Sequence, residues 1–185
     1  MTGKLLLIVI VLAEVWGLTA FGIKNVPKTL IYYTQISNLT AMISALLLLV
    51  IGPKPWILTL RYLSVCMLVM TFIVVICVLL PMLRNTEMLL TSRSGFFMHV
   101  VCPVLNVISY LFFELYPRST WIFLPPAVTL VYGVIMMYMN YIGKVDGPYP
   151  FFRVRNQSVL ATVLWIIVLF GAVYLISIGV YRLSI

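Results

Sequence analysis

Six long apolar runs follow one another along this chain, and each ends at a short break rich in polar residues or proline. A helix needs about 20 apolar residues to cross the hydrocarbon core of a bilayer. The runs therefore predict six membrane-spanning helices joined by short loops. The expected spans are residues 4–22, 31–51, 58–80, 96–116, 120–142 and 158–183. The first run also has the form of a secretory signal peptide, and we expect it to remain as a span.

The composition excludes a soluble globule. Of the 185 residues, 64% are hydrophobic and 9% are charged, whereas soluble domains carry about 25% charged residues. We therefore expect an all-α integral membrane protein, a single six-transmembrane-helix bundle over residues 1–185. The net charge of +8 does not indicate nucleic-acid binding, because the basic residues are scattered over the ends of the apolar runs, where they face lipid headgroups.

Six spans place both termini on one side of the membrane, here side A, and the loops after the first, third and fifth spans on side B. Basic residues are counted on each side, because cytoplasmic loops carry an excess of Lys and Arg. Side B has Lys24, Lys28, Arg84, Arg93, Lys144, Arg153 and Arg155. Side A has Lys4, Lys54, Arg61, Arg118 and Arg182. The rule weakly favours side B as the cytoplasmic side.

The most polar stretch inside a predicted span is residues 32–38. At 3.6 residues per turn, Thr34, Ser37 and Asn38 share one helix face, with Ala41 one turn further on. Hydroxyl and amide side chains commonly join neighbouring spans by hydrogen bonds, and this structural role is the alternative for each of them. Together with Gln35 they make four such residues in seven, which favours a site.

The single histidine, His99, lies four residues before Pro103 in the fourth span. Pro103 cannot donate to the His99 carbonyl, so the helix is predicted to open there. The second and fourth spans both start from side B, and Thr34 and His99 each lie about three residues in, hence at similar depth. A hydroxyl and an imidazole at matched depth could form a nucleophile and its base. A packing role is the alternative.

Glu14 and Glu114 are the other ionisable groups inside predicted spans. Glu114 lies roughly 22 Å from His99 along the helix axis, so it cannot orient the imidazole. For Glu14 near mid-span, pairing with a Tyr or Ser, protonation and a structural role all remain open. One histidine and two distant glutamates do not make a metal-ligand set, and we expect neither a metal nor another cofactor.

Three motifs resemble those of the androgen-induced protein superfamily of six-span membrane proteins. Residues 33–38, Tyr-Thr-Gln-Ile-Ser-Asn, resemble the family's Phe-Thr-x-Gln-Ser-Asn signature, His99 to Pro103 resembles its His-x-x-x-Pro element, and residues 149–151 resemble its Tyr-Pro-Phe loop. The matches follow the family's order over most of the chain. In this chain Gln35 directly follows Thr34, whereas the family form has Gln next to Ser. The threonine, serine and asparagine stay in register.

The resemblance implies an activity. Characterised animal members are intramembrane hydrolases of fatty acid esters of hydroxy fatty acids, with a Thr nucleophile and a His. This implies Thr34 as the nucleophile, His99 as the base and a lipid or fatty-acyl ester as the partner. Oxyanion or supporting roles would fall to Asn38, Ser37 and Gln35, and substrate binding to Lys144, Tyr149, Arg153 and Arg155. The small size resembles a microbial branch, which implies the plasma membrane.

The alternative is a non-enzymatic lipid-binding protein or a small transporter, in which the polar cluster joins helices or lines a path. The sequence shows no inverted repeat and no paired broken helices of the transporter kind. The hydrolase hypothesis predicts the Thr34 hydroxyl within about 5 Å of the His99 ring. For a substrate with long acyl chains it also predicts an apolar cavity that extends from Thr34 towards mid-membrane. The second, fourth and fifth spans would wall this cavity, with Pro125, Pro126 and Gly133 bending or thinning the fifth.

Overall fold

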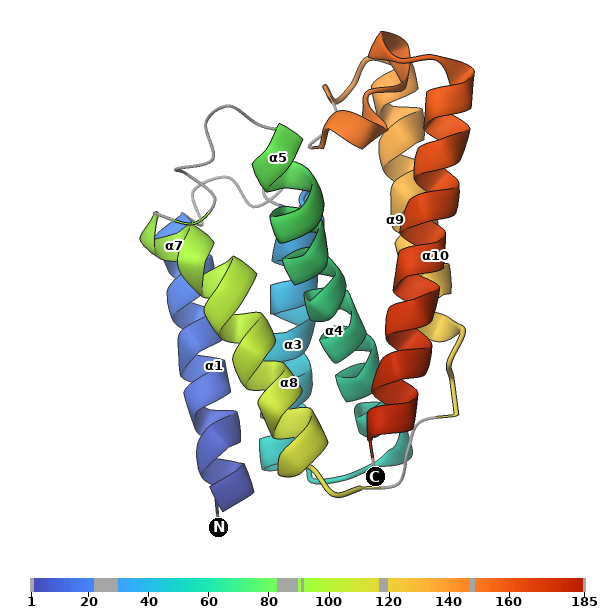
Figure 1. Cartoon of the computed structure of the whole chain (residues 1–185). Coiled ribbons are helices and arrows are strands. Elements are labelled where there is room, and N and C mark those ends of the chain that lie inside the picture. Colours follow the sequence, from blue (N-terminus) through green and yellow to red (C-terminus); the bar gives the residue numbers. More distant parts are fainter. Residues whose placement is uncertain are drawn as a thin grey trace.

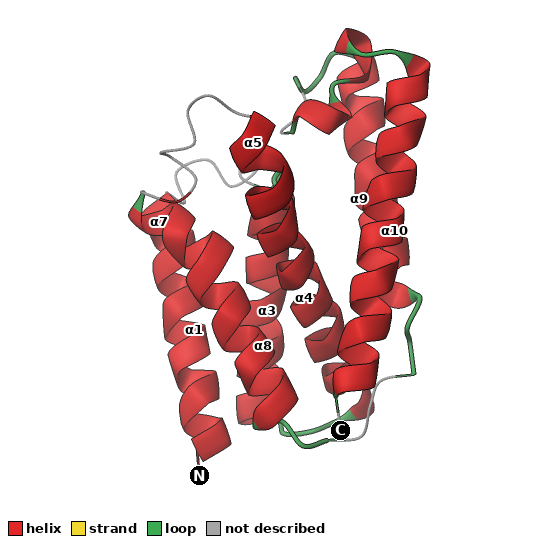
Figure 2. Cartoon of the chain, in the orientation of Figure 1, coloured by secondary structure: helices red, strands yellow, loops and turns green. Residues whose placement is uncertain are grey.

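The computed structural model describes residues 2–21, 30–82, 90, 92–116, 120–146 and 149–184. Within this part of the chain all regular structure is helical, and the long helices stand side by side as a bundle (Figures 1 and 2). The first described residues and the end of the last helix lie at the same end of the bundle (Figure 1). This arrangement agrees with the prediction that both termini lie on side A.

One half of the bundle contains three helical rods. Helix α1 (Thr2–Phe21) packs against α3 (Tyr33–Val50) and against a rod made of α7 (Arg93–Phe96), η3 (Phe97–Val101) and α8 (Cys102–Phe112). Helix α3 also packs along α4 (Pro55–Val74), which continues through η2 (Val75–Leu79) into α5 (Leu80–Met82). The α4 rod therefore lies between this half and the rest of the molecule.

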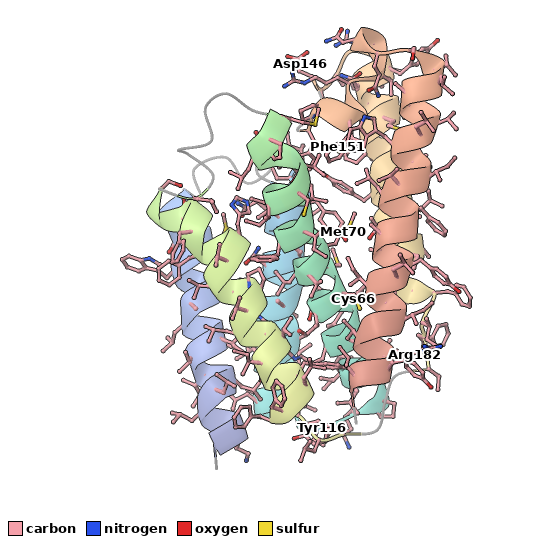
Figure 3. The ribbon with its side chains drawn as sticks, viewed as in Figure 1. Cys66, Met70, Tyr116, Asp146, Phe151 and Arg182 are labelled. Carbon is pink, nitrogen blue, oxygen red and sulfur yellow. The ribbon has the colours of Figure 1, made fainter. Side chains whose placement is uncertain are left out.

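The other half is the pair of α9 (Leu124–Tyr141) and α10 (Val159–Leu183), with the 3₁₀ turns η4 (Pro150–Phe152) and η5 (Val154–Asn156) in the loop between them. The largest cluster of buried apolar side chains joins this pair to α3 and α4. Met70 and Phe151 belong to it and lie between the α4 rod and the α9–α10 pair (Figure 3).

In the described part of the chain, two π-helical turns interrupt the rods, and each lies shortly before a proline. Turn η2 precedes Pro81, and turn η3, which contains His99, precedes Pro103. A proline has no N–H to donate, and its ring clashes with the carbonyl four residues back. Widening the turn relieves the clash, and the Cys102 N–H bonds the Phe97 carbonyl instead. The predicted opening of the helix before Pro103 is therefore confirmed.

Five of the described helices are long and apolar enough to cross a membrane. They correspond to the first, second, third, fourth and sixth predicted spans. Helix α9, the expected fifth span, is not among them, because Pro125, Pro126, Gly133 and Asn140 lower its hydropathy. The structure thus supports an all-α membrane bundle, whereas six spans are not confirmed. Much of α10 is exposed and apolar, as a lipid-facing helix requires.

Helix α1 approaches η3 very closely at Gly17. A Cβ atom on Gly17 would lie 2.9 Å from Met98 Cγ, well inside the contact distance of two carbon atoms. We expect Gly17→Val to lower the free energy of unfolding by about 1–3 kcal/mol through overpacking. Thermal unfolding of the purified protein in detergent measures this. Gly171→Val in α10, where a Cβ has nothing within 4 Å, is the matched control, and equal losses in the two variants would contradict the close approach.

Candidate functional site

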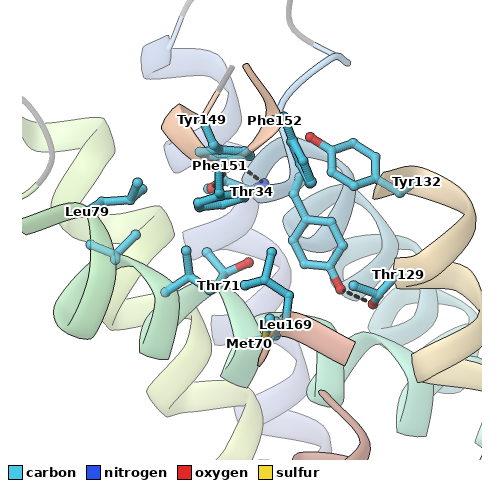
Figure 4. Close-up of a pocket in the computed structure, with 13 residues that line it drawn as sticks. Thr34, Met70, Thr71, Leu79, Thr129, Tyr132, Tyr149, Phe151, Phe152 and Leu169 are labelled. Atoms are coloured by element: carbon cyan, nitrogen blue, oxygen red, sulfur yellow. Dashed lines mark hydrogen bonds between the residues drawn. The ribbon is translucent and has the colours of Figure 1, made fainter. Parts of the chain in front are cut away.

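Thr34 lies in the first turn of α3 and is only 6% exposed. N–H groups in the first turn of a helix have no partner within the helix. The Thr34 N–H points to the Tyr149 hydroxyl at 3.4 Å, and the Thr34 hydroxyl lies 3.4 Å from the same oxygen (Figure 4). The Tyr149 hydroxyl, from the loop after α9, thus contacts both the side-chain hydroxyl and the backbone N–H of Thr34.

Ser37, Asn38 and Gln35 connect α3 to its neighbours. The Ser37 hydroxyl donates to the Thr34 carbonyl at 3.0 Å and lies 3.0 Å from the Thr71 hydroxyl on α4. Asn38 Nδ2 donates to the carbonyls of Thr34 at 2.7 Å and Met98 at 3.3 Å. Gln35 Nε2 donates to the Met98 sulfur. These donors already have protein partners, so their geometry favours a structural role over the expected oxyanion role.

His99 is buried on η3, next to Met98 in sequence. The bonds from Asn38 and Gln35 to Met98 hold η3 against the first two turns of α3. Thr34 and His99 therefore lie on two elements, α3 and η3, that contact each other, but His99 does not line the pocket at Thr34. The separation of about 5 Å between the Thr34 hydroxyl and the His99 ring stays a prediction.

A small apolar pocket lies beside Thr34 (Figure 4). Its volume is about 40 Å³, which is room for about three water molecules. An apolar pocket is therefore present at Thr34, but it is too small for the long acyl chains that the prediction assumed, and its predicted walls are partly wrong. They come from the second, third, fifth and sixth predicted spans and from the loop before α10. The lining residues are Tyr33, Thr34, Met70, Thr71, Val74, Val75, Leu79, Thr129, Tyr132, Tyr149, Phe151, Phe152 and Leu169.

The Tyr-Pro-Phe loop covers this pocket with aromatic rings. Tyr149 stacks on Phe151 with ring centroids 5.2 Å apart, and Phe151 meets Phe152 edge to face at 4.8 Å. Burial raises the pKa of the Tyr149 hydroxyl above its ordinary value, because the charged phenolate would lose its solvation. Tyr149 therefore remains a neutral phenol that can donate a hydrogen bond.

The three basic residues expected to bind substrate lie outside the pocket. Lys144, Arg153 and Arg155 are exposed around the same loop. Arg155 Nη2 lies 3.4 Å from Asp146 Oδ1 in an exposed ion pair. These cations form a basic rim on side B, at the end of the bundle that carries Tyr149.

A second buried polar cluster lies towards side A, and the sequence interpretation of Arg61 is wrong. Arg61 was expected to face headgroups on side A, but it is 0% exposed. Its Nε and Nη2 donate to Glu114 Oε2 and Oε1 at 3.0 and 2.6 Å, and its Nη1 donates to Asn106 Oδ1 at 2.8 Å. Arg61 lies near the start of the third predicted span and Glu114 near the end of the fourth, so both lie towards side A. A comparison of their depths in the membrane could therefore have paired them.

No cluster of three His, Cys, Asp or Glu side chains that could hold a metal ion occurs among the described residues. Comparison with known proteins gives no relative: no family model, no curated protein and no solved structure matches this chain.

Proposed function

We propose that this protein is an intramembrane hydrolase of lipid esters, in which Thr34 is the nucleophile and His99 the base. One observation carries the proposal: Thr34 lines an apolar pocket, and its N–H and its hydroxyl both meet the Tyr149 hydroxyl at a long 3.4 Å, which a substrate oxygen would have to displace. The resemblance of the three motifs to the androgen-induced protein superfamily supports the same residues. The proposal also places the protein in the plasma membrane of a microbe.

The proposed reaction follows acyl transfer through a threonine ester. His99 takes the hydroxyl proton while Thr34 Oγ1 bonds to the ester carbonyl carbon. The resulting oxyanion accepts hydrogen bonds from the Thr34 N–H, at the positive end of the α3 dipole, and from the Tyr149 O–H. The C–O bond to the alcohol then breaks, and the alcohol leaves with the proton from His99. His99 then deprotonates a water molecule, whose oxygen bonds to the acyl carbon. The bond from this carbon to Thr34 Oγ1 breaks, His99 returns the proton to Oγ1, and the acid leaves.

The pocket volume limits how the substrate lies. About 40 Å³ cannot hold a long acyl chain, so the chain must extend beyond the pocket. A second apolar pocket between α9 and α10 shares Thr129, Phe151, Phe152 and Leu169 with the first. We infer that an acyl chain joins the two by displacing the Phe152 ring, while a substrate carboxylate stays on the basic rim of Lys144, Arg153 and Arg155.

The proposal is tested with a panel of lipid esters and the purified protein in lipid nanodiscs. We expect turnover of acyl esters, and we expect Tyr149→Phe to lower kcat about 10²–10³-fold, as the loss of one oxyanion donor does, with Tm nearly unchanged. Tyr138→Phe on α9, a tyrosine that is 60% exposed, is the matched control. Absence of turnover for every ester, or equal rates in the two variants, would count against the hydrolase.

A non-enzymatic lipid-binding protein or small transporter is the second candidate. The engaged donors of Ser37, Asn38 and Gln35 favour it, because they join helices without any chemistry. This candidate predicts that the esters bind in the same pocket but remain intact over the incubation. The lipid panel therefore separates the two functions if bound and cleaved lipid are both measured.

A further inference from the structure

A chain of buried hydrogen bonds runs from Arg61 towards α1 and fixes the orientation of each group. Arginine has only donors, so Asn106 must turn its Oδ1 to Arg61 Nη1. Asn106 Nδ2 then donates to Glu14 Oε1 at 3.1 Å and to the Cys102 carbonyl at 2.9 Å. Glu14 Oε1 is therefore an acceptor, and Oε2 is the carboxyl oxygen that remains for another partner.

The same reasoning fixes the orientation of the Asn38 side-chain amide. The carbonyls of Thr34 and Met98 can only accept hydrogen bonds, so Asn38 turns its Nδ2 to both. Its Oδ1 remains. Within the described part of the chain, Glu14 Oε2 and Asn38 Oδ1 are the two buried side-chain atoms that lack a hydrogen-bond partner. Both residues are 0% exposed.

Glu14 and Asn38 lie at the same depth on neighbouring antiparallel helices. Glu14 comes 12 residues after Thr2 in α1, and Asn38 comes 12 residues before Val50 in α3. Each is therefore roughly 18 Å from the side A end of its helix. These two ends are level, because Gly3 and Val50 line the same hollow. Met98, which bonds Asn38, also lies over Gly17, one turn beyond Glu14.

The charges around Glu14 do not balance without one more positive charge. Arg61 and Glu114 compensate each other through two hydrogen bonds. An ionised Glu14 would accept the hydrogen bond from Asn106 but would have no countercharge of its own inside the bundle, which is very costly. We propose that Glu14 holds a proton on Oε2 and donates it to Asn38 Oδ1, so that the junction of α1, α3 and the η3–α8 helix is a proton-binding site. A single proton satisfies both oxygens, and this site does not depend on the hydrolase activity.

Among the described residues, few other titratable groups face the Glu14 carboxyl group. The Cys102 thiol on α8 contacts it, and Arg61 on α4 acts on it from a distance. Helix α3 contains no charged residue. On the same helical rod as Cys102, Arg93 is the first residue of α7. His99 lies three residues before Cys102, about one helical turn further away from Asn106. A pH effect on Glu14 therefore has to be separated from the Cys102 thiol and from His99.

Infrared spectroscopy of the purified protein tests the proposal directly, because only a protonated carboxyl group gives the carboxylic acid C=O stretching band. We expect this band in the wild type at neutral pH and its loss in Glu14→Gln. Asn38→Leu should keep the band and move it to higher frequency, because the acid loses its acceptor. Asp146→Asn, which changes an exposed carboxylate, should leave the band unchanged. A band that persists in Glu14→Gln, or no band in the wild type, would overturn the proposal.

A pH series of thermal unfolding gives a second readout. The proton stabilises the folded protein only while it is bound, so wild-type Tm should fall by several degrees as the pH rises from neutral to alkaline. Glu14→Gln keeps a hydrogen donor without a charge, and its Tm should not follow pH in this range. Cys102→Ala and His99→Ala should follow the wild type. If the wild-type Tm rises with Na⁺ concentration and does not change with pH, the site binds an alkali ion, and the proposal of a bound proton is refuted.

Discussion

Arg61→Gln is expected to lower the free energy of unfolding by about 3–5 kcal/mol, because it removes one partner of a buried ion pair and leaves the other uncompensated. Glu114 would keep only the Ser109 hydroxyl as a hydrogen-bond donor, and Asn106 would lose the group that orients it. Denaturation of the purified protein in mixed micelles measures the loss. Arg155→Gln, which breaks an exposed ion pair, is the matched control and should barely change stability.

The double variant Arg61→Gln/Glu114→Gln makes this prediction sharper. Removing both charges leaves no bare carboxylate, so the double variant should lose much less stability than the two single losses added together. Strict additivity would mean that Arg61 and Glu114 do not act as a pair. An Arg61→Gln protein as stable as Arg155→Gln would contradict the buried position of the guanidinium.

Thr34→Ala is expected to abolish ester hydrolysis, with a loss on the scale of the ~10⁶ found for removal of a serine hydrolase's nucleophile. Its stability should fall by only about 1 kcal/mol, because interhelical hydrogen bonds in membranes are modest. Thr34→Ser retains a hydroxyl and should retain part of the rate. Thr40→Ala is the matched control on the same helix, because the Thr40 hydroxyl bonds only the Ile36 carbonyl in its own helix at 2.7 Å.

His99→Ala should lose activity to a similar extent, and Thr34→Ala/His99→Ala should lose almost nothing further, because a nucleophile and its base act as one unit. If Thr34 only joins helices, the pattern reverses. Stability would then fall in Thr34→Ala, and activity would fall only in proportion to the folded fraction. A well-folded and fully active Thr34→Ala protein would refute the catalytic assignment.

The helices were predictable because in lipid every backbone group must bond within its own helix, so apolar run length reports span length. Helix α9 shows where this signal weakens: its prolines and Asn140 reduce the hydropathy although the helix forms. The buried face of Thr34, Ser37 and Asn38 was also predictable, since helical period alone determines which residues share a face.

The partners of these residues were not predictable, because pairing depends on how rods pack. Tyr149 is distant from Thr34 in sequence, and the loop resemblance gave it a substrate-binding role, whereas its hydroxyl lies 3.4 Å from Thr34 Oγ1. Arg61 was placed among headgroup-facing charges, since a basic residue near a span end usually lies there. Only the packing of α4 against α8 brings it to Asn106 and Glu114.

Labelling with a fluorophosphonate probe, followed by peptide mass spectrometry, shows whether Thr34 carries an activated hydroxyl. Such a probe reacts with an activated hydroxyl and does not mark a threonine that only packs. We expect a single phosphonylated residue, Thr34, with labelling lost in Thr34→Ala, strongly reduced in His99→Ala and retained in Thr40→Ala. Folded protein that stays unlabelled, or a label that remains at another residue when Thr34 is replaced, would contradict this expectation.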